Sequence, residues 1–283
     1  MTGYDGAVLL FRRKRSWQRR VADAARSAPK RGRGLRAAAA QLDIPFARTR
    51  VATTARELFM RLVLQPMMDF YAARRATGRD KLSSLRGPVI LVANHASHMD
   101  TPVILAALPR KLRKRTAVAA AADYFYRYRL VAFVVSLIFN TVPIDRRGGA
   151  LNGGSSHLDK LLDQGWNLLL YPEGTRSRSG GPGRLRRGAA VLAQAHNLAV
   201  VPIRVTGTSA AMPPGRLWPR RLRGKLLSHR HPVEVAFGEP IRPGAEASVL
   251  IERVQRFFED GEGGGGLASP YRRRWTPSAT RSR

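Results

Sequence analysis

The residues best suited to carry out chemistry form the run Asn94-His95-Ala96-Ser97-His98-Met99-Asp100, directly after the apolar run Val89-Ile90-Leu91-Val92-Ala93. A histidine and an aspartate five positions apart can meet where a turn enters a helix, so that the carboxylate orients the imidazole and stabilises its protonated form. The chain has no cysteine and no serine in a nucleophile elbow. A His95–Asp100 pair would therefore most naturally deprotonate a hydroxyl group of the substrate.

Two other interpretations of this run stay open. Asp100 could be an ordinary helix cap before Thr101-Pro102, with His95 a loop residue that has its hydrogen bonds satisfied. His95, His98 and Asp100 are also side chains of the types that bind zinc. No other convincing cluster in the sequence completes a set of zinc ligands.

A second polar run, Tyr171-Pro172-Glu173-Gly174-Thr175-Arg176-Ser177, also follows an apolar segment. Glycine lets backbone amides approach an anion, and arginine binds two oxygens at once, so the run could cradle a phosphate. It could equally be a solvated turn. Two weaker runs follow apolar segments in the same way, Ile144-Asp145-Arg146-Arg147 and Val200-Val201-Pro202-Ile203.

The segments that would position these residues alternate between strand-like and helix-like patterns. This alternation predicts an α/β fold with a mostly parallel central sheet flanked by helices, over residues 85–260. Strands are expected at 89–93, 117–119, 142–144, 167–171, 199–205 and 233–237, and helices at 101–108, 126–139, 151–162, 185–196 and 248–259.

The segments outside this domain are of three kinds. Residues 1–50 carry thirteen Lys and Arg against three Asp, the composition of a disordered basic arm. Residues 51–84 have helical apolar spacing and form an amphipathic helical lead-in, which Pro66 should kink. This lead-in packs on the domain or lies on a membrane surface. Residues 261–283 are a Gly-rich linker and a basic tail.

The charge of the chain is its most unusual property, because 50 Lys and Arg against 19 Asp and Glu give a formal net charge of +31. Such a protein must meet an anionic partner, and nucleic acid, an acidic membrane leaflet and phosphorylated substrates all qualify. Against nucleic acid, aromatic residues are only 7% and no basic-aromatic stacking motif stands out. The longest uncharged apolar stretch, residues 130–144, is shorter than a spanning helix, and the N-terminus lacks the pattern of a secretory signal.

Together, the four runs are similar to a known set of motifs. Asn-His-x-Ser-x-x-Asp, Ile-Asp-Arg, Pro-Glu-Gly-Thr-Arg-Ser and Val-Pro-Ile, in this order and spacing, resemble the four blocks of the lysophosphatidate acyltransferase family of glycerolipid acyltransferases. The resemblance covers residues 85–210, and its first and third blocks are highly specific. One departure is Thr141-Val142-Pro143, where the family more often has glycine and an aromatic residue.

The resemblance implies transfer of a fatty acyl group from acyl-CoA or acyl-carrier protein to a hydroxyl of a lysophospholipid, foremost 1-acylglycerol-3-phosphate; another lysolipid or a glycolipid is the alternative acceptor. It makes His95 the general base and Asp100 its partner, and gives Pro202 a supporting or acyl-donor role. No metal or other cofactor is expected. The chain would act at the cytoplasmic face of an anionic membrane as a peripheral or monotopic protein. The resemblance assigns the acceptor's phosphate to Arg146, Glu173, Gly174, Thr175 and Arg176.

Overall fold

The computed structural model describes most of the predicted domain and the segment before it. The described residues are 42–121, 129–144, 156–174, 183, 185–213, 215–216, 218–223, 228–242 and 246–260. Most of the predicted basic arm and the whole C-terminal linker and tail lie outside them.

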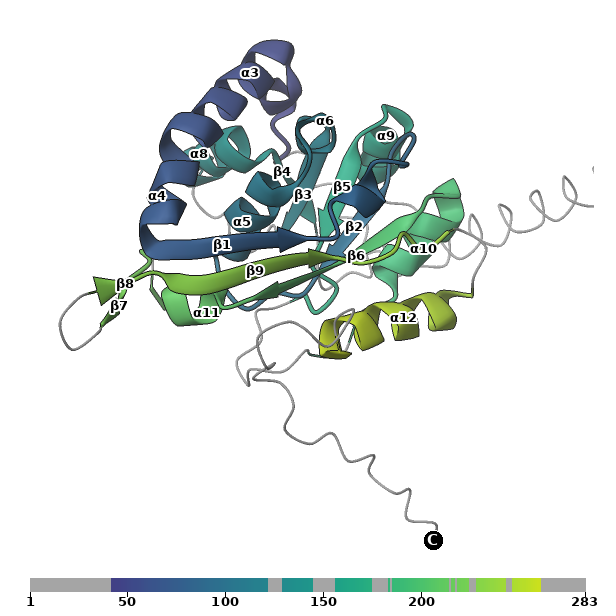
Figure 1. Cartoon of the computed structure of the whole chain (residues 1–283). Coiled ribbons are helices and arrows are strands. Elements are labelled where there is room, and N and C mark those ends of the chain that lie inside the picture. Colours follow the sequence, from purple (N-terminus) through teal and green to yellow (C-terminus); the bar gives the residue numbers. More distant parts are fainter. Residues whose placement is uncertain are drawn as a thin grey trace, which may run out of the picture.

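A seven-stranded sheet forms the centre of the molecule, in the order β1-β9-β6-β2-β5-β3-β4 (Figure 1). The five strands from β6 to β4 are parallel, whereas β9 is antiparallel to β6 and β1 is parallel to β9. The mostly parallel sheet predicted from the sequence is confirmed. The strands are β1 (Ala72–Thr77), β2 (Ile90–Ala93), β3 (Thr116–Ala121), β4 (Thr141–Ile144), β5 (Asn167–Leu170), β6 (Val200–Thr206) and β9 (His231–Phe237), and a separate hairpin pairs β7 (Leu222–Arg223) with β8 (Ser228–His229).

Helices cover both faces of this sheet, so the molecule has three layers (Figure 1). α5 and the α3–α4 segment pack on one face, and α9, α10 and α12 pack on the other. The predicted helices at 101–108, 185–196 and 248–259 correspond to α5, α10 and α12, and the described parts of the two at 126–139 and 151–162 are α8 and α9. The helices are α3 (Arg50–Phe59), α4 (Gln65–Tyr71), α5 (Asp100–Ala107), α6 (Arg110–Arg113), α8 (Arg129–Phe139), α9 (Ser156–Asp163), α10 (Gly188–His196), α11 (Thr208–Ala211) and α12 (Ala247–Asp260), with short 3₁₀ turns at η1 (Pro45–Arg48) and η3 (Asp80–Leu82).

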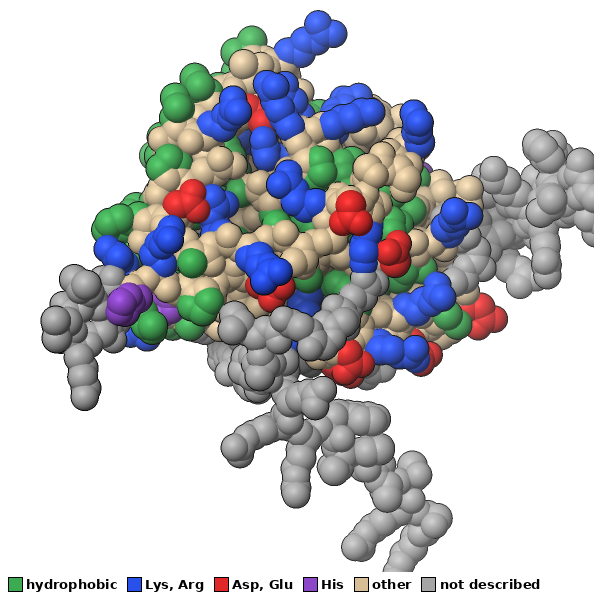
Figure 2. Space-filling view, in the orientation of Figure 1, with side chains coloured by type: hydrophobic (Ala, Val, Ile, Leu, Met, Phe, Trp, Pro, Cys, Tyr) green, Lys and Arg blue, Asp and Glu red, His purple; other side chains and the backbone are tan. Residues whose placement is uncertain are grey.

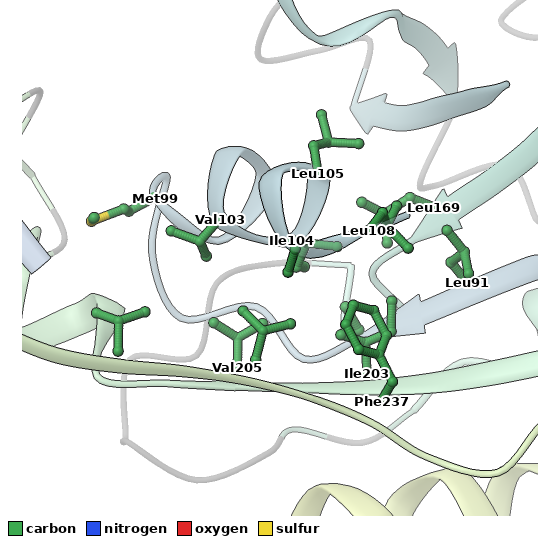
Figure 3. Packing of buried hydrophobic residues seen from close by; sticks show 14 of the residues in the cluster. Leu91, Met99, Val103, Ile104, Leu105, Leu108, Leu169, Ile203, Val205 and Phe237 are labelled. Carbon is green, nitrogen blue, oxygen red and sulfur yellow. The ribbon is translucent and has the colours of Figure 1, made fainter. Parts of the chain in front are cut away.

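The apolar runs of the central strands divide their side chains between two cores, because successive residues of a strand point to opposite faces. In β2, Leu91 belongs to the core beneath α5, whereas Ile90 belongs to the core beneath α9 and α10. Figure 3 shows the first of these cores, with Val103, Ile104 and other α5 side chains lying on the sheet. Strands buried on both faces explain why these segments are continuous apolar runs.

The lead-in segment differs from its prediction in two ways. Around Pro66 the helix continues through a π-helical turn, η2 (Met60–Leu64), in which the amide of Gln65 donates to the carbonyl of Met60. The wider turn accommodates a residue that lacks an amide proton. Residues 72–77, which were expected in the helical lead-in, are instead strand β1 at the edge of the sheet. Its sequence, Ala-Ala-Arg-Arg-Ala-Thr, is mostly exposed, and arginines are tolerated there because only one side of the strand is paired.

Candidate active site

The His95–Asp100 pair lies where the parallel strand β2 ends and α5 begins. Nδ1 of His95 is 2.9 Å from Oδ2 of Asp100. Because a carboxylate accepts hydrogen bonds, Nδ1 is the donor in this contact, and in a neutral imidazole Nε2 then presents its lone pair. The His95 side chain is 18% exposed, whereas that of Asp100 is 0% exposed. The contact predicted from the five-residue spacing is therefore present, with the imidazole reachable from solvent and the carboxylate enclosed.

The Asp100 carboxylate is held by four donors. Oδ2 accepts hydrogen bonds from His95 and from the backbone amides of Ala96 (2.7 Å) and Ser97 (2.8 Å), and Oδ1 accepts one from the Thr208 hydroxyl (2.5 Å). A buried carboxylate requires such partners. The amides belong to the turn before α5, whose N-cap residue is Met99 without a side-chain cap. Asp100 thus orients His95 and is not simply a helix cap.

Two further residues of the first block hold this turn in place. Asn94 bridges β2 to β6, since its side-chain amide donates to the carbonyl of Val205 (2.9 Å) and accepts from the amide of Val205 (2.7 Å). The hydroxyl of Ser97 donates to the carbonyl of Met212 (2.8 Å) and accepts from the amide of Met99 (3.1 Å). Asn94 and Ser97 therefore attach the two ends of the His95 turn to β6 and to the end of α11.

Tyr171, at the end of β5, packs against the other side of the histidine. Its ring stacks on the His95 imidazole, with 4.2 Å between ring centres and 25° between planes. The Tyr171 hydroxyl is 2.8 Å from the hydroxyl of Thr101. Burial, with the nearby charge of Asp100, raises the pKa of Tyr171 well above its ordinary value. Tyr171 therefore stays protonated at neutral pH and serves as a platform for the imidazole.

Glu173 ties the third block to the first. Its Oε1 accepts a hydrogen bond from the amide of His95 (3.1 Å), and its Oε2 accepts one from the amide of Gly183 (3.2 Å). Burial raises the pKa of Glu173, while these two amide hydrogen bonds act in the opposite direction. The described partners of the Glu173 carboxylate are backbone amides, one of them on the candidate base.

Gly174 is the point at which Arg186 approaches the third block. Gly174 has φ +71°, a conformation that favours glycine. A Cβ atom at this position would lie 2.9 Å from Nε and 3.0 Å from Cζ of Arg186. The backbone of Arg186 is held by its amide, which donates to the carbonyl of Pro172 (3.0 Å). Sequence reasoning missed Arg186, which comes after the end of the recognised block.

The other predicted site residues have mixed outcomes. Arg146, Thr175 and Arg176 lie outside the described residues. Pro202 lies inside β6, level with Val92 of β2, and its carbonyl accepts from the amide of Gly238 (2.9 Å); this position is consistent with a supporting role. Within the part of the chain that the structure describes, no group of three or more His, Asp or Glu side chains is placed to hold a metal ion.

Comparison with known proteins extends these observations. Residues 73–206 match the family model described as Acyltransferase. The chain is 30% identical over 184 residues to the chloroplastic 1-acyl-sn-glycerol-3-phosphate acyltransferase LPAT1 of Arabidopsis thaliana, covering 63% of this chain and 46% of that protein. It is 28% identical over 167 residues to the human 1-acyl-sn-glycerol-3-phosphate acyltransferase alpha, covering 58% and 56%. The chain thus spans about half the length of these relatives.

A solved structure shares the fold. The 1-acyl-sn-glycerophosphate (LPA) acyltransferase PlsC of Thermotoga maritima matches with a TM-score of 0.55 and 23% identity, over 74% of this chain and 77% of that one. The α/β fold expected from the sequence is therefore found in an acyltransferase structure. The motif blocks, the family model and the sequence relatives therefore agree: residues 73–206 match an acyltransferase domain, and the chain is similar to 1-acyl-sn-glycerol-3-phosphate acyltransferases.

Proposed function

We propose that this protein transfers a fatty acyl group from the thioester of acyl-CoA or acyl-carrier protein to the hydroxyl of 1-acylglycerol-3-phosphate, giving phosphatidate. The observation that carries the proposal is the hydrogen bond between His95 and Asp100, in the first block of a chain whose relatives are named for this reaction. A thioester is already activated, so the reaction needs a base and correct positioning of the two substrates.

In the proposed mechanism, Nε2 of His95 takes the proton of the acceptor hydroxyl while its oxygen attacks the thioester carbonyl carbon. The new C–O bond forms a tetrahedral intermediate, and the C–S bond breaks when that intermediate collapses. The protonated imidazole, stabilised by Asp100, then returns its proton to the departing sulfur. Two contacts restrict how far His95 can move: the stacking of its ring on Tyr171 and the hydrogen bond that its backbone amide donates to Glu173.

The acceptor's phosphate is proposed to bind at the third block, through Arg176 and Thr175 with Arg146 of the second block. The Arg186 guanidinium beside Gly174 supports an anion-binding role for this part of the molecule, since a guanidinium can bind two phosphate oxygens at once. A carboxyl group has no cation to offer a phosphate, so the proposed contribution of Glu173 to phosphate binding is to hold the His95 turn and the chain at Gly183 in place.

A lipid acceptor also requires a membrane-facing surface, which we propose is formed by α3, α4 and α8. The exposed large apolar side chains of these helices and of the turn η2 between α3 and α4 are Val51, Leu58, Leu62, Val63, Phe70, Leu130, Val131, Phe133 and Val134. In Figure 2, hydrophobic side chains gather along the border of the molecule where Figure 1 draws α3 and α4. Within the described residues, no helix is both long and apolar enough to span a bilayer.

The difference between the buried and the exposed sides of these helices supports this proposal. On α3, the charged residue Glu57 is buried and paired with Arg113, whereas Leu58 of α3 and Leu62 of the following turn η2 are 58% and 67% exposed. On α8, Ala132 and Ser136 are buried, whereas Leu130 is 75% exposed. A cluster of exposed apolar side chains beside cations such as Arg61 fits the interface of an anionic bilayer.

The proposal is tested by measuring acyl transfer to a panel of lysolipids with both CoA and carrier-protein thioesters. Transfer to 1-acylglycerol-3-phosphate should exceed transfer to a neutral monoacylglycerol, and His95→Ala should lower the rate about 10²- to 10⁴-fold without unfolding the protein. Arg176→Ala should raise the acceptor KM more than the donor KM, and Arg176→Lys should restore it poorly. Near-normal turnover by folded His95→Ala protein would eliminate the mechanism, and transfer only to uncharged acceptors would eliminate the phosphate site.

A further inference from the structure

The Asp100 carboxylate has a partner outside all four motif blocks, Thr208. This threonine begins α11, directly after β6, and is 0% exposed. Its hydroxyl lies 2.5 Å from Oδ1 of Asp100, the oxygen that does not face His95. We propose that Thr208 is a positioning residue of the acyl transfer reaction, which sets the orientation of Asp100 and through it that of the His95 base. This inference rests on the proposed function.

The donors to the carboxylate are divided unevenly between its two oxygens. Oδ2 accepts from His95 Nδ1 and from the amides of Ala96 and Ser97. Among the described residues, the donor to Oδ1 is Thr208. The last torsion of an aspartate side chain is broad and weakly restricted on its own. A hydrogen bond to Oδ1 therefore limits rotation of the carboxylate plane, and that plane determines the direction in which Oδ2 meets the imidazole.

The backbone places Thr208 with little freedom. Gly207, immediately before it, has φ +83°, and a Cβ atom there would lie 2.0 Å from the carbonyl oxygen of Pro232. Only glycine allows β6 to end so close to the neighbouring strand β9. The chain turns at this point into α11, in which the amide of Met212 donates to the carbonyl of Thr208 (2.8 Å).

α11 is joined to the His95–Asp100 turn at both of its ends. At its start, the Thr208 hydroxyl donates to Asp100. At its end, the Met212 carbonyl accepts from the Ser97 hydroxyl at 2.8 Å. These two contacts cross between segments that are more than 100 residues apart in the chain. The four-residue helix α11 therefore supports the turn that carries the base, and Thr208 is the residue of this helix that contacts the carboxylate.

The test compares Thr208→Val, which replaces the hydroxyl by a methyl group of similar size, with Thr208→Ser, which keeps the hydroxyl. The matched control is Thr206→Val, at the last residue of β6, two positions before Thr208 and half-buried. Thr208→Val should lower kcat about 10- to 100-fold, the usual cost of removing a partner that orients a functional side chain. It should leave both KM values within about twofold, because the fully buried Thr208 offers no surface to a substrate. Thr208→Ser should recover most of the rate, and Thr206→Val should behave like the wild type.

A double-mutant cycle separates this role from a general effect on folding. If Thr208 acts through Asp100, Thr208→Val should cost little further activity in an Asp100→Ala background, so that the two effects are far from additive. Additive effects, equal damage from serine and valine, or a wild-type kcat in folded Thr208→Val protein would each overturn the proposal.

A spectroscopic readout tests the inference independently of turnover. In the wild type the Nδ1 proton of His95 should give a downfield NMR resonance, assigned by its absence in His95→Ala. This resonance should persist in Thr208→Ser and broaden or shift in Thr208→Val; an unchanged resonance in Thr208→Val would count against the inference. If no lysolipid accepts an acyl group, the proposed function fails, and this measurement still decides whether Thr208 holds the pair.

Discussion

The backbone amide of His95 donates a hydrogen bond to the side chain of Glu173, so the residue that carries the candidate base is tied to a block 78 residues later in the chain. The other oxygen of the same carboxylate accepts from the amide of Gly183. One side chain thus joins the turn after β2, the end of β5 and the segment that leads to α10. The base and the proposed phosphate site share this support.

Replacing Glu173 should therefore impair catalysis through the position of His95. Glu173→Ala removes the acceptor for two amides, and the displaced His95 turn should lower kcat about 10²-fold. Glu173→Gln keeps one carbonyl oxygen and should cost less. The measurement is steady-state kinetics on protein whose folding is checked by thermal melting. Equal kcat values for the wild type and Glu173→Ala would show that the His95 turn holds its position without this contact.

Gly174 and Arg186 should behave as a coupled pair. A methyl group on Gly174 would collide with the Arg186 guanidinium and would also place alanine at φ +71°. Gly174→Ala and Arg186→Ala should both raise the acceptor KM, and the double variant should be little worse than either single variant. Arg187→Ala is the matched control, because Arg187 is the exposed neighbour of Arg186. A similar loss in Arg187→Ala would mean that bulk positive charge, rather than the position of Arg186, attracts the acceptor.

The ion pair that anchors α3 should make the protein sensitive to acid. Arg113 donates to both oxygens of Glu57, through Nε and Nη2, each at 2.8 Å. Burial alone would raise the pKa of Glu57, but the hydrogen bond and charge of Arg113, with Lys114 and Arg110, outweigh it and hold the pKa below its ordinary value. The stabilisation is therefore fully present above the ordinary carboxyl pKa of 4.5 and is lost as the pH falls through the lower, folded-state value.

Glu57→Ala should lower the free energy of unfolding at neutral pH by about 3 kcal/mol, since it leaves Arg113 without its carboxylate partner. The difference from the wild type should shrink below pH 4.5. Glu252→Gln, in the exposed pair with Arg256, provides the control and should change stability little. Denaturant titrations across pH would measure both. A constant difference between wild type and Glu57→Ala down to pH 2 would contradict the assigned ion pair.

The exposed apolar side chains of α3 and η2 should govern vesicle binding. Changing Leu58 and Leu62 together to serine should reduce sedimentation with anionic vesicles, while activity on detergent-dispersed acceptor stays within about twofold. Val249→Ser on α12, which is also exposed, serves as the control. Binding should weaken with added salt in every variant, because the cations of the protein contribute as well. Unchanged sedimentation of the Leu58 and Leu62 double variant would mean that another part of the protein contacts the lipid.

The central strands could be predicted from the sequence because burial on both faces makes them continuous apolar runs, as in Ile90–Ala93 and Asn167–Leu170. The His95–Asp100 contact could be predicted because it is local and needs only a turn at a strand end. β1 could not be predicted, since its sequence is rich in Ala and Arg and its pairing depends on an edge position. The prediction of a helical lead-in over residues 51–84, which rested on apolar periodicity, therefore wrongly included the residues of β1.

The rest of the site depends on which strands become neighbours. Thr208 reaches Asp100 because β6 lies next to β2, and Glu173 reaches the amide of His95 because β5 lies on the other side of β2. Thr208 lies outside the motif blocks and threonine is a common residue, so nothing in the sequence marks it. Glu173 lies in the third block, but nothing in the sequence shows that it accepts from the amide of His95. Arg186 is one of many arginines in this chain, so the sequence does not single it out. Its place in the site follows from the fold, which brings its guanidinium against Gly174, where there is no Cβ atom.

The strand order also has a consequence for the order of events during synthesis. β1 pairs with β9, so residues 72–77 meet their partners at residues 231–236, and β9 lies between β1 and the rest of the sheet. Domains begin to fold while the ribosome is still elongating them. Here α4 and β1 emerge early, yet β1 has no neighbouring strand until nearly the whole domain has been translated. For that interval the apolar segment before β1 is present on the nascent chain while the edge of the sheet that it joins has not yet been made.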